Sequence, residues 1–396
     1  MHAPLPSRTP DAGVNPATRP LIWFIGFFAF LNVYSLQSVL PMVMHDFQAT
    51  PVQAGLAVGA TVLAIGLISP FMGMVSDAFG RKNIVCGSLL FLTLPTALIP
   101  LVQSSPQLIA LRFLQGLAVP GIVVVIIAYI AEEFRLGGVA RMTTVYVGGT
   151  VMGGFCGRFI TGHAGDLLGW RGAFLALALL NFLGALAVIL WLPASRHFKP
   201  QSNFSAGFRT LASHLKNARL MAACAVGFCV LFSLVGAFTY VNLYLAAPPF
   251  LLSSAGLANV FLVYLVGVLV TPLAARWIER QGYKRCLQSA MLVSALGLLC
   301  TVRSDLWWVV PGLAVCSTGV FLCQSATIST IAKNVSVGRS LATGIYYFFY
   351  YAGGAAGSWL TGLAFEHYGW HGTVCVIVGF DILGVAIVTW VWRGSR

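Results

Sequence analysis

Twelve long apolar stretches, each close to the length of one membrane-crossing helix, dominate the sequence. A bilayer core about 30 Å thick requires about 20 apolar residues in a helix. Only 8% of the 396 residues are charged, against about 25% in soluble globular domains. The pattern predicts an all-α integral membrane protein and excludes a soluble enzyme. The predicted transmembrane helices cover residues 21–44, 52–75, 83–102, 107–131, 141–163, 171–192, 219–246, 254–275, 285–302, 306–331, 341–363 and 372–392.

Two polar segments lie outside this pattern. Residues 1–20 contain several prolines and no apolar run, so they predict a cytoplasmic tail and not a cleavable signal peptide. Residues 193–218 are rich in proline, serine and basic residues and predict a cytoplasmic linker, in part an amphipathic surface helix. The linker divides the chain into an N-terminal six-helix bundle, 21–192, and a C-terminal six-helix bundle, 219–396.

The basic residues predict the orientation in the membrane. With the N-terminus inside, 19 of the 23 Lys and Arg residues lie on the inner side, two lie outside, and Arg112 and Arg158 lie within helices. This bias is what the positive-inside rule requires. The net charge of +13 therefore indicates orientation and not nucleic-acid binding. We expect both termini to be cytoplasmic, in a bacterial-type inner (plasma) membrane.

An internal repeat relates the two halves at an offset close to 200 residues. Residues 161–172 read TGHAGDLLGWRG, and residues 361–372 read TGLAFEHYGWHG. Three glycines between 153 and 157 recur between 353 and 357. Two six-helix units in the same orientation imply a pseudo-two-fold axis along the membrane normal, with a substrate site near the midplane between the bundles.

The loop after the second span carries the first motif, at residues 73–82. Gly73 permits close helix approach, Asp77 can accept backbone hydrogen bonds, and Gly80 can adopt a positive φ. Arg81 and Lys82 would anchor the inner face. In the fourth span, Arg112 begins the sequence R-x-x-Q-G, which includes Gln115. A guanidinium inside a span is costly unless it is paired or hydrated, so Arg112 is either mechanistic or a structural donor to helix carbonyls.

These motifs resemble the signatures of the major facilitator superfamily, and the wider pattern, including IAEEF and GGFCGR, most resembles its YnfM-like, arabinose-efflux-like exporters of the drug:proton antiporter type. The resemblance implies a secondary active transporter, not an enzyme, that exports small molecules in exchange for protons. It also implies that the 73–82 loop locks the halves, with Arg81 paired to Glu132 or Glu133. Arg112 would couple proton movement to substrate.

The fifth span departs from the glycine-rich element of the antiporter branches. Gly154 stands where that element has proline, and Arg158 stands at its last glycine. Arg158 is expected toward the outer end of its helix, either extended to the membrane surface or paired with Asp46 of the first span. Both residues are coupling or gating candidates. Asp381 is the one acid in the middle of a span, either a proton carrier or a protonated, hydrogen-bonded group.

The resemblance places spans 1, 4, 7 and 10 around the substrate cavity, and span eleven adds stacked tyrosines. Aromatic rings with few fixed charges suit amphipathic or planar aromatic cargo and also attract cations. The amides leave export of a sugar or another native metabolite open, and any single tyrosine could instead serve packing. The cavity candidates are Asn32, Tyr34, Gln37, Arg112, Gln115, Tyr240, Asn242, Tyr244, Gln324, Tyr347 and Tyr350.

The expected partners are a small-molecule substrate, protons and the lipid bilayer, with no nucleic acid, and we expect a monomer. The sequence has no GxxxxGK[ST] nucleotide-binding motif, and neither a cofactor nor a metal is expected. Two further classes remain as alternatives. A membrane-embedded transferase would need acids or histidines clustered in a surface loop, and a non-transporting scaffold would predict a lost 73–82 motif or large added domains.

Overall fold

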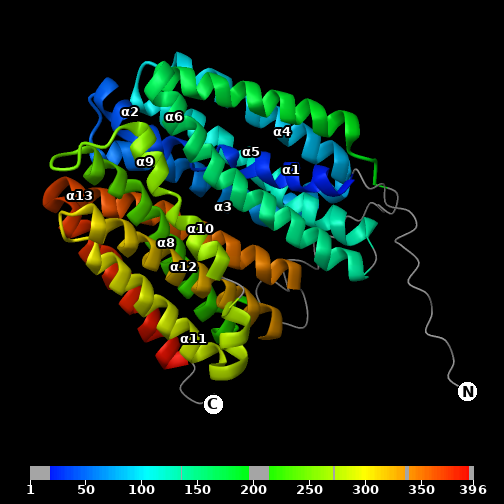
Figure 1. Ribbon diagram of the computed structural model, residues 1–396. Helices are drawn as coiled ribbons and strands as arrows, with labels where there is room; N and C mark the ends of the chain where they lie inside the picture. Colours follow the sequence, from blue (N-terminus) through cyan, green and yellow to red (C-terminus); the bar gives the residue numbers. More distant parts are fainter. Residues whose placement is uncertain (1–17, 135, 196–213, 271–272, 335–338, 392–396) are drawn as a thin grey trace, which may run out of the picture.

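The protein is all-helical in the computed structural model, which describes residues 18–134, 136–195, 214–270, 273–334 and 339–391 (Figure 1). Each long helix is an apolar segment that satisfies its backbone hydrogen bonds internally, as a segment in lipid must. The helices are α1 (Thr18–Leu31), η1 (Ser35–Val39), α2 (Leu40–Asp46), α3 (Pro51–Phe79), α4 (Arg81–Leu98), η2 (Ile99–Leu101), α5 (Ser105–Glu133), α6 (Leu136–Trp191), α8 (Ala218–Ala246), α9 (Ser254–Val260), α10 (Val263–Val270), α11 (Leu273–Cys300), α12 (Leu306–Asn334) and α13 (Arg339–Val391).

The two longest helices are each a pair of spans. At 1.5 Å per residue, the 51 apolar residues Arg141–Trp191 would extend about 76 Å as one straight helix, more than twice the bilayer core. The chain instead reverses at Gly169 in α6 and at Gly369 in α13, where φ is 70° and 61°. Only glycine adopts this conformation readily. With the remaining helices, these hairpins confirm the predicted twelve-span fold of two related six-helix bundles.

Helix α1 begins at Thr18, three residues before the predicted start of the first span at residue 21. Two details of the expected spans are wrong. The first span is not one helix: it breaks after Leu31 and continues as η1 and α2, with a bend of 45°. The eighth span is broken between α9 and α10. Most of the predicted tail and linker, residues 1–17 and 196–213, lies outside the described residues.

The internal repeat appears in the packing as two equivalent glycine-lined helix contacts. Cβ atoms added at Gly149, Gly153 and Gly157 of α6 would lie 2.1, 2.0 and 1.9 Å from backbone oxygens of α1. Cβ atoms added at Gly353 and Gly357 of α13 would lie 2.1 and 2.5 Å from backbone oxygens of α8. Glycines four residues apart therefore let the two backbones touch in both halves.

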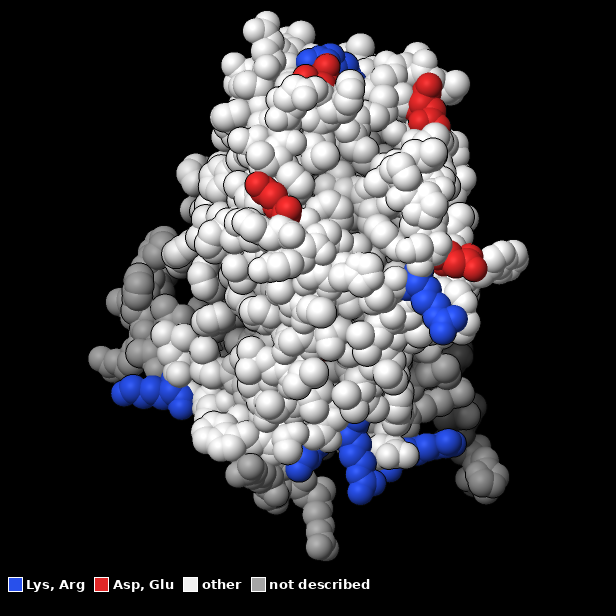
Figure 2. Space-filling model, turned by 90° about the vertical axis from the view of Figure 1, so that its left-hand side faces the viewer, with Lys and Arg blue, Asp and Glu red and all other residues white. Residues whose placement is uncertain are grey.

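Figure 1 shows the helices in two groups, α1–α6 and α8–α13, that spread apart toward the side where α1 begins and α13 ends. We call this side the terminal face and the other side the opposite face. Figure 2 shows much of the opposite face as uncharged, with scattered acidic residues; blue residues lie beside red ones at the top and at the right side, and more of them lie along the lower edge. This distribution agrees with the asymmetry of basic residues along the sequence.

Candidate functional site

Arg112 of α5 lies fully buried at the break in the first span. Its Nε and terminal nitrogens donate to the carbonyl oxygens of Ala57, at 3.3 Å, Asn32, at 2.8 Å, and Val33. A terminal nitrogen also donates to Oε1 of Gln115, at 2.7 Å. Four of its five N–H groups thus have acceptors, and all of these belong to the N-terminal bundle.

The break explains why the guanidinium can be buried there. Unwinding after Leu31 leaves backbone carbonyls with few or no helical partners. Arg112 donates to two of them, that of Val33 and that of Asn32, which also accepts from the backbone N–H of Ser35 at 3.4 Å. Gln115 extends the network by donating to Thr96 Oγ1 at 2.7 Å. These contacts favour the structural interpretation of Arg112, while its role in coupling stays a prediction.

Arg158 of α6 lies between the two bundles, and its guanidinium is surrounded by aromatic rings. The carbon Cζ lies 4.5 Å from the ring centre of Tyr34, 4.7 Å from that of Phe261 and 4.9 Å from that of Tyr264. Tyr34 belongs to the N-terminal bundle, whereas Phe261 and Tyr264 belong to the C-terminal bundle. Cation–π contacts of this kind are stronger away from water, and Arg158 is only 4% exposed.

The sequence prediction for Arg158 was wrong. The side chain neither extends to the membrane surface nor pairs with Asp46. Its Nε donates to Oε1 of Gln37 at 2.7 Å, and a terminal nitrogen donates to the carbonyl oxygen of Gly154 at 2.7 Å. Asp46 instead pairs with Arg171 and accepts from Trp170 Nε1 at 3.1 Å. Arg158 points inward because the aromatic rings and Gln37 offer it partners there.

Gln37 joins the two bundles at this level. Its Oε1 accepts from Arg158, while its Nε2 donates to Oγ1 of Thr239 in α8 at 3.0 Å. Gln37 and Thr239 are 1% and 0% exposed. A buried polar contact between two apolar bundles is costly to break without replacement, so this one fixes their relative position.

The opposite face is closed by further contacts between the bundles. The hydroxyl of Tyr240 lies 3.1 Å from the carbonyl oxygen of Pro51 in the N-terminal bundle and 2.6 Å from that of Ser358 in its own bundle. Asp166 Oδ2 accepts from Ser253 Oγ at 2.6 Å and from the backbone N–H of Ala255 at 3.1 Å. Tyr240, expected in the substrate cavity, therefore lies at this closure.

The other predicted cavity residues are dispersed. Asn242 donates to the carbonyl oxygen of Phe238 in its own helix at 2.6 Å, and Tyr244 stacks on Trp370 with 5.4 Å between ring centres. Gln324 is half-buried in α12. The tyrosines of α13 do stack one turn apart as predicted, with 5.6 Å between the rings of Tyr346 and Tyr350, and 6.1 Å between those of Tyr347 and Tyr351.

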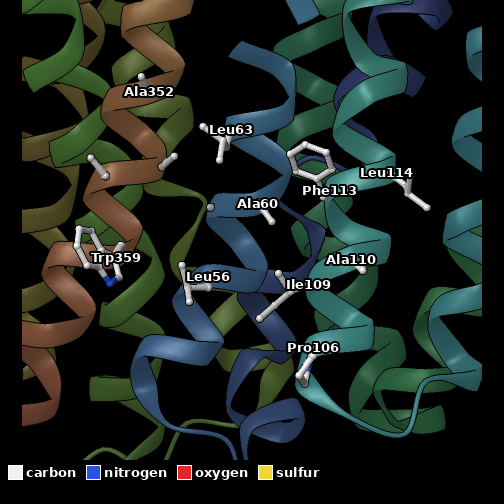
Figure 3. Close-up of a pocket in the computed structure, with 13 residues that line it drawn as sticks. Leu56, Ala60, Leu63, Pro106, Ile109, Ala110, Phe113, Leu114, Ala352 and Trp359 are labelled. Carbon is white, nitrogen blue, oxygen red and sulfur yellow. The ribbon is translucent and has the colours of Figure 1, made fainter. Parts of the chain in front are cut away.

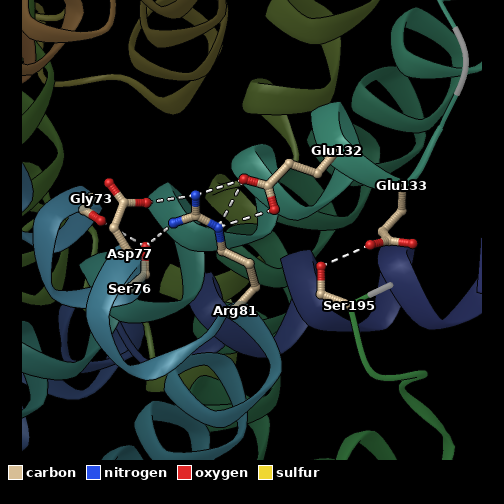
Figure 4. Close-up of polar contacts among 7 residues, drawn as sticks. All are labelled: Gly73, Ser76, Asp77, Arg81, Glu132, Glu133 and Ser195. Atoms are coloured by element: carbon tan, nitrogen blue, oxygen red, sulfur yellow. Dashed lines mark hydrogen bonds and ion pairs between the residues drawn. The ribbon is translucent and has the colours of Figure 1, made fainter. Parts of the chain in front are cut away.

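The motif after the second span forms an ion-pair cluster at the terminal face (Figure 4). A terminal nitrogen of Arg81 lies 2.6 Å from Oδ1 of Asp77 and 2.6 Å from Oε1 of Glu132, and Arg81 also donates to Ser76. The expected contact between Arg81 and the end of the fourth span is therefore present. Glu133 accepts from Ser195 Oγ at 2.7 Å. The role of this cluster in gating stays a prediction.

The small residues of the motif behave differently from one another. Gly80 adopts a φ of 88°, as the pattern predicts. Gly73 was expected to permit close helix approach, but a Cβ added there would meet no heavy atom within 4 Å. Its carbonyl oxygen accepts from Ser76 Oγ at 2.9 Å instead. Lys82 is half-buried at the start of α4.

Asp381 lies inside the C-terminal bundle and is 2% exposed. Its Oδ1 accepts from Ser233 Oγ at 2.6 Å, whereas Oδ2 has no hydrogen-bond partner among the described residues. The equivalent residue of the repeat, Asn181, also has unpaired polar atoms. This position places the carboxyl among helices of one bundle and away from the contacts between Gln37 and Thr239.

An apolar groove of about 890 Å³ runs between α3, α5 and α13 (Figure 3). Figure 3 shows Leu56, Leu63, Phe113 and Trp359 around it. None of the predicted cavity residues lines it. Several of its side chains are exposed, including Trp359 at 47%. In a bilayer, such side chains face lipid chains.

Sequence reasoning missed Phe261, Tyr264, Thr239 and Asp166. Only spans 1, 4, 7, 10 and 11 were considered as cavity elements, and span eight was left out. The second span, α3, packs on α13, whose first arm is the eleventh span. A pseudo-two-fold axis then requires the fifth span to pack on the eighth, so the internal repeat pointed to span eight. A Cβ added at Gly162 would lie 2.4 Å from that of Ala258, which shows this contact.

The comparisons with known proteins agree with this architecture. The chain is 31% identical over 367 residues to the inner membrane transport protein YnfM of Escherichia coli, covering 92% of this chain and 88% of YnfM. It is 27% identical over 179 residues to the multi-drug resistance efflux pump PmrA of Streptococcus pneumoniae, covering 43% of this chain and 44% of PmrA.

The crystal structure of the nucleoside transporter NupG superimposes with a TM-score of 0.77 at 15% identity, covering 94% of this chain and 99% of NupG. This likeness establishes the fold alone. The family described as the Major Facilitator Superfamily matches residues 22–267 and 246–396. These matches and the two related six-helix bundles show that the chain is a multi-pass membrane transporter belonging to the major facilitator superfamily.

Proposed function

We propose that this transporter exports amphipathic or aromatic small molecules in exchange for protons, by alternating access between its two bundles. It would act in a bacterial-type inner membrane as a monomer, with the terminal face in the cytoplasm. The basic residues of the sequence support this orientation. The likeness to YnfM, an inner membrane transport protein, and to PmrA, a multi-drug efflux pump, supports the location and the direction.

The contact from Arg158 through Gln37 to Thr239 is the observation that carries the proposal. It joins the two bundles, and the contacts of Tyr240 with Pro51 and of Asp166 with Ser253 close the opposite face. The bundles spread apart toward the terminal face (Figure 1). A substrate entering from the terminal face would meet Arg158 and its aromatic rings, and rocking of the bundles would then expose them to the opposite side.

Proton coupling requires a group inside the spans whose charge changes with transport. Asp381 is buried with one unpaired carboxylate oxygen, and Arg112 holds the break that positions Gln37. The guanidinium of Arg112 keeps its charge, so Arg112, the coupling candidate, would act indirectly, through the contacts that fix the segment reaching the other bundle. The Arg81 cluster at the terminal face would act as the gate.

Uptake into everted vesicles with an imposed pH gradient tests the proposal. Ethidium, 2-naphthoate and arabinose represent a cationic dye, an anionic aromatic compound and a pentose. We expect uptake of an aromatic compound that ends when the gradient is collapsed, and weaker uptake in Arg112→Ala and Asp77→Asn. Uptake that survives collapse of the gradient would contradict proton coupling. Uptake of arabinose alone would favour the alternative, export of a sugar.

A further inference from the structure

The two guanidinium groups inside the spans differ in how many of their N–H groups have acceptors. Arg112 uses four of five. Arg158 uses two of five, toward Gln37 and Gly154. Both are almost fully buried. Only Arg158 therefore retains a set of donors that nothing in the described part of the chain satisfies.

Arg158 also lacks a counter-charge. The described ion pairs involve Arg81 and Arg171, and no described carboxylate lies within ion-pair distance of Arg158. A buried cation is costly unless an anion or strong acceptors compensate for lost hydration. The rings of Tyr34, Phe261 and Tyr264 compensate only in part, because they cover the guanidinium but accept no strong hydrogen bond.

A polar group without a partner belongs to one of the rings around this guanidinium. The hydroxyl of Tyr264, whose ring contacts Arg158, is buried without a hydrogen-bond partner among the described residues. This hydroxyl can donate to an anion. Free guanidinium donors beside the ring that carries this hydroxyl form an incomplete anion site, which a carboxylate or sulfonate would complete with charge-assisted hydrogen bonds.

We propose that Arg158 binds the anionic group of the transported molecule, so that the preferred substrates are aromatic or amphipathic acids. The inference rests on the proposed function and narrows its substrate class. The aromatic rings around Arg158 would hold the apolar part of the acid. The anion also competes for the guanidinium with Gln37, which links the bundles. Substrate binding thereby weakens the contact that fixes the bundles together.

Binding to the full-length protein in a non-ionic detergent tests this assignment. Isothermal titration compares 2-naphthoate, 2-naphthalenesulfonate and the uncharged 2-naphthamide, all in one dilute Tris–chloride buffer that contains no carboxylate or sulfonate. We expect at least one of the two acids to bind about ten- to a hundredfold more tightly than the amide, the effect of a few charge-assisted hydrogen bonds. A wild-type protein that binds neither acid more tightly than the amide overturns the proposal.

Two variants test whether Arg158 is the residue that binds the anionic group. Arg158→Gln should abolish the preference for acids, and Arg158→Lys should retain part of it because the charge remains. The matched control is Arg303→Gln, because Arg303 also lies over a ring, that of Trp308 at 4.7 Å, but is exposed. A preference that persists in Arg158→Gln overturns the proposal. If Arg158→Gln fails to fold, Tyr264→Phe, which keeps the ring, is measured in its place. Loss of the preference for acids in Tyr264→Phe supports the site, and an unchanged preference counts against it.

Anion binding at Arg158 and export are tested by different experiments, so either one can fail without the other. Binding is measured without a gradient, whereas export is measured in vesicles. A protein that binds 2-naphthoate through Arg158 but does not transport it retains the anion site and contradicts export. A protein that exports ethidium or arabinose without preferring acids supports export and overturns the anion site.

Discussion

Replacing Arg112 by methionine tests whether this guanidinium holds the break in the first span. The substitution removes four hydrogen bonds, to Asn32, Val33, Ala57 and Gln115. Methionine fills part of the space of the side chain and leaves no buried charge. The loss therefore comes mainly from acceptors that remain without a donor.

The magnitude follows from which acceptors have a second partner. The carbonyl of Asn32 also accepts from Ser35 Oγ at 3.0 Å, and that of Ala57 lies within α3. The carbonyl of Val33 and Oε1 of Gln115 accept no other described hydrogen bond. An unsatisfied buried polar group costs about 1–3 kcal/mol. With two such groups, we expect the free energy of unfolding to fall by about 2–6 kcal/mol.

Reversible unfolding in mixed dodecylmaltoside–SDS micelles, followed by the helical circular dichroism signal, measures this change. Arg303→Met is the control, since an exposed arginine should change stability by no more than about 0.5 kcal/mol. If Arg112→Met unfolds at the same SDS fraction as Arg303→Met, the structural interpretation is refuted. A stable Arg112→Met that has lost transport would then assign the residue to coupling alone.

Three further predictions follow from individual contacts. Gly149→Ala should destabilise the protein, because its Cβ would lie 2.1 Å from a backbone oxygen. The Cβ of Gly148→Ala would lie 3.8 Å from its nearest atom, so this control should be neutral or stabilising by up to about 1 kcal/mol. Thermal unfolding of the two variants measures the difference. Glu132→Gln should weaken its contact with Arg81, at 2.6 Å, and increase maleimide labelling of cysteines placed at the terminal face; unchanged labelling would argue against a gate. Tyr240→Phe should lower stability by about 1 kcal/mol and increase labelling at the opposite face, because the hydroxyl loses its 3.1 Å contact with Pro51 of the other bundle; labelling there equal to that of the wild type would contradict its role in closure.

Much of the fold could be predicted from the internal repeat and from the positions of the glycines in the sequence. Apolar length gives the number of spans because lipid admits only internally satisfied helices. Gly80 and Gly169 mark turns, because a positive φ is costly for other residues. Glycines at spacing four predicted helix contacts, which the packing of Gly153 on α1 shows. The pair of Arg81 with Glu132 was expected only from the resemblance to the superfamily motif, and it is present.

The partners of the two buried arginines were decided by the tertiary structure. The sequence shows that Arg112 and Arg158 lie within spans, but it does not show that the first span unwinds beside Arg112. It also does not show that Phe261 and Tyr264 reach Arg158 from the other bundle. Local sequence determines helices through hydrogen bonds that each segment makes with itself. Contacts between bundles depend on rotations and breaks that many distant residues fix together.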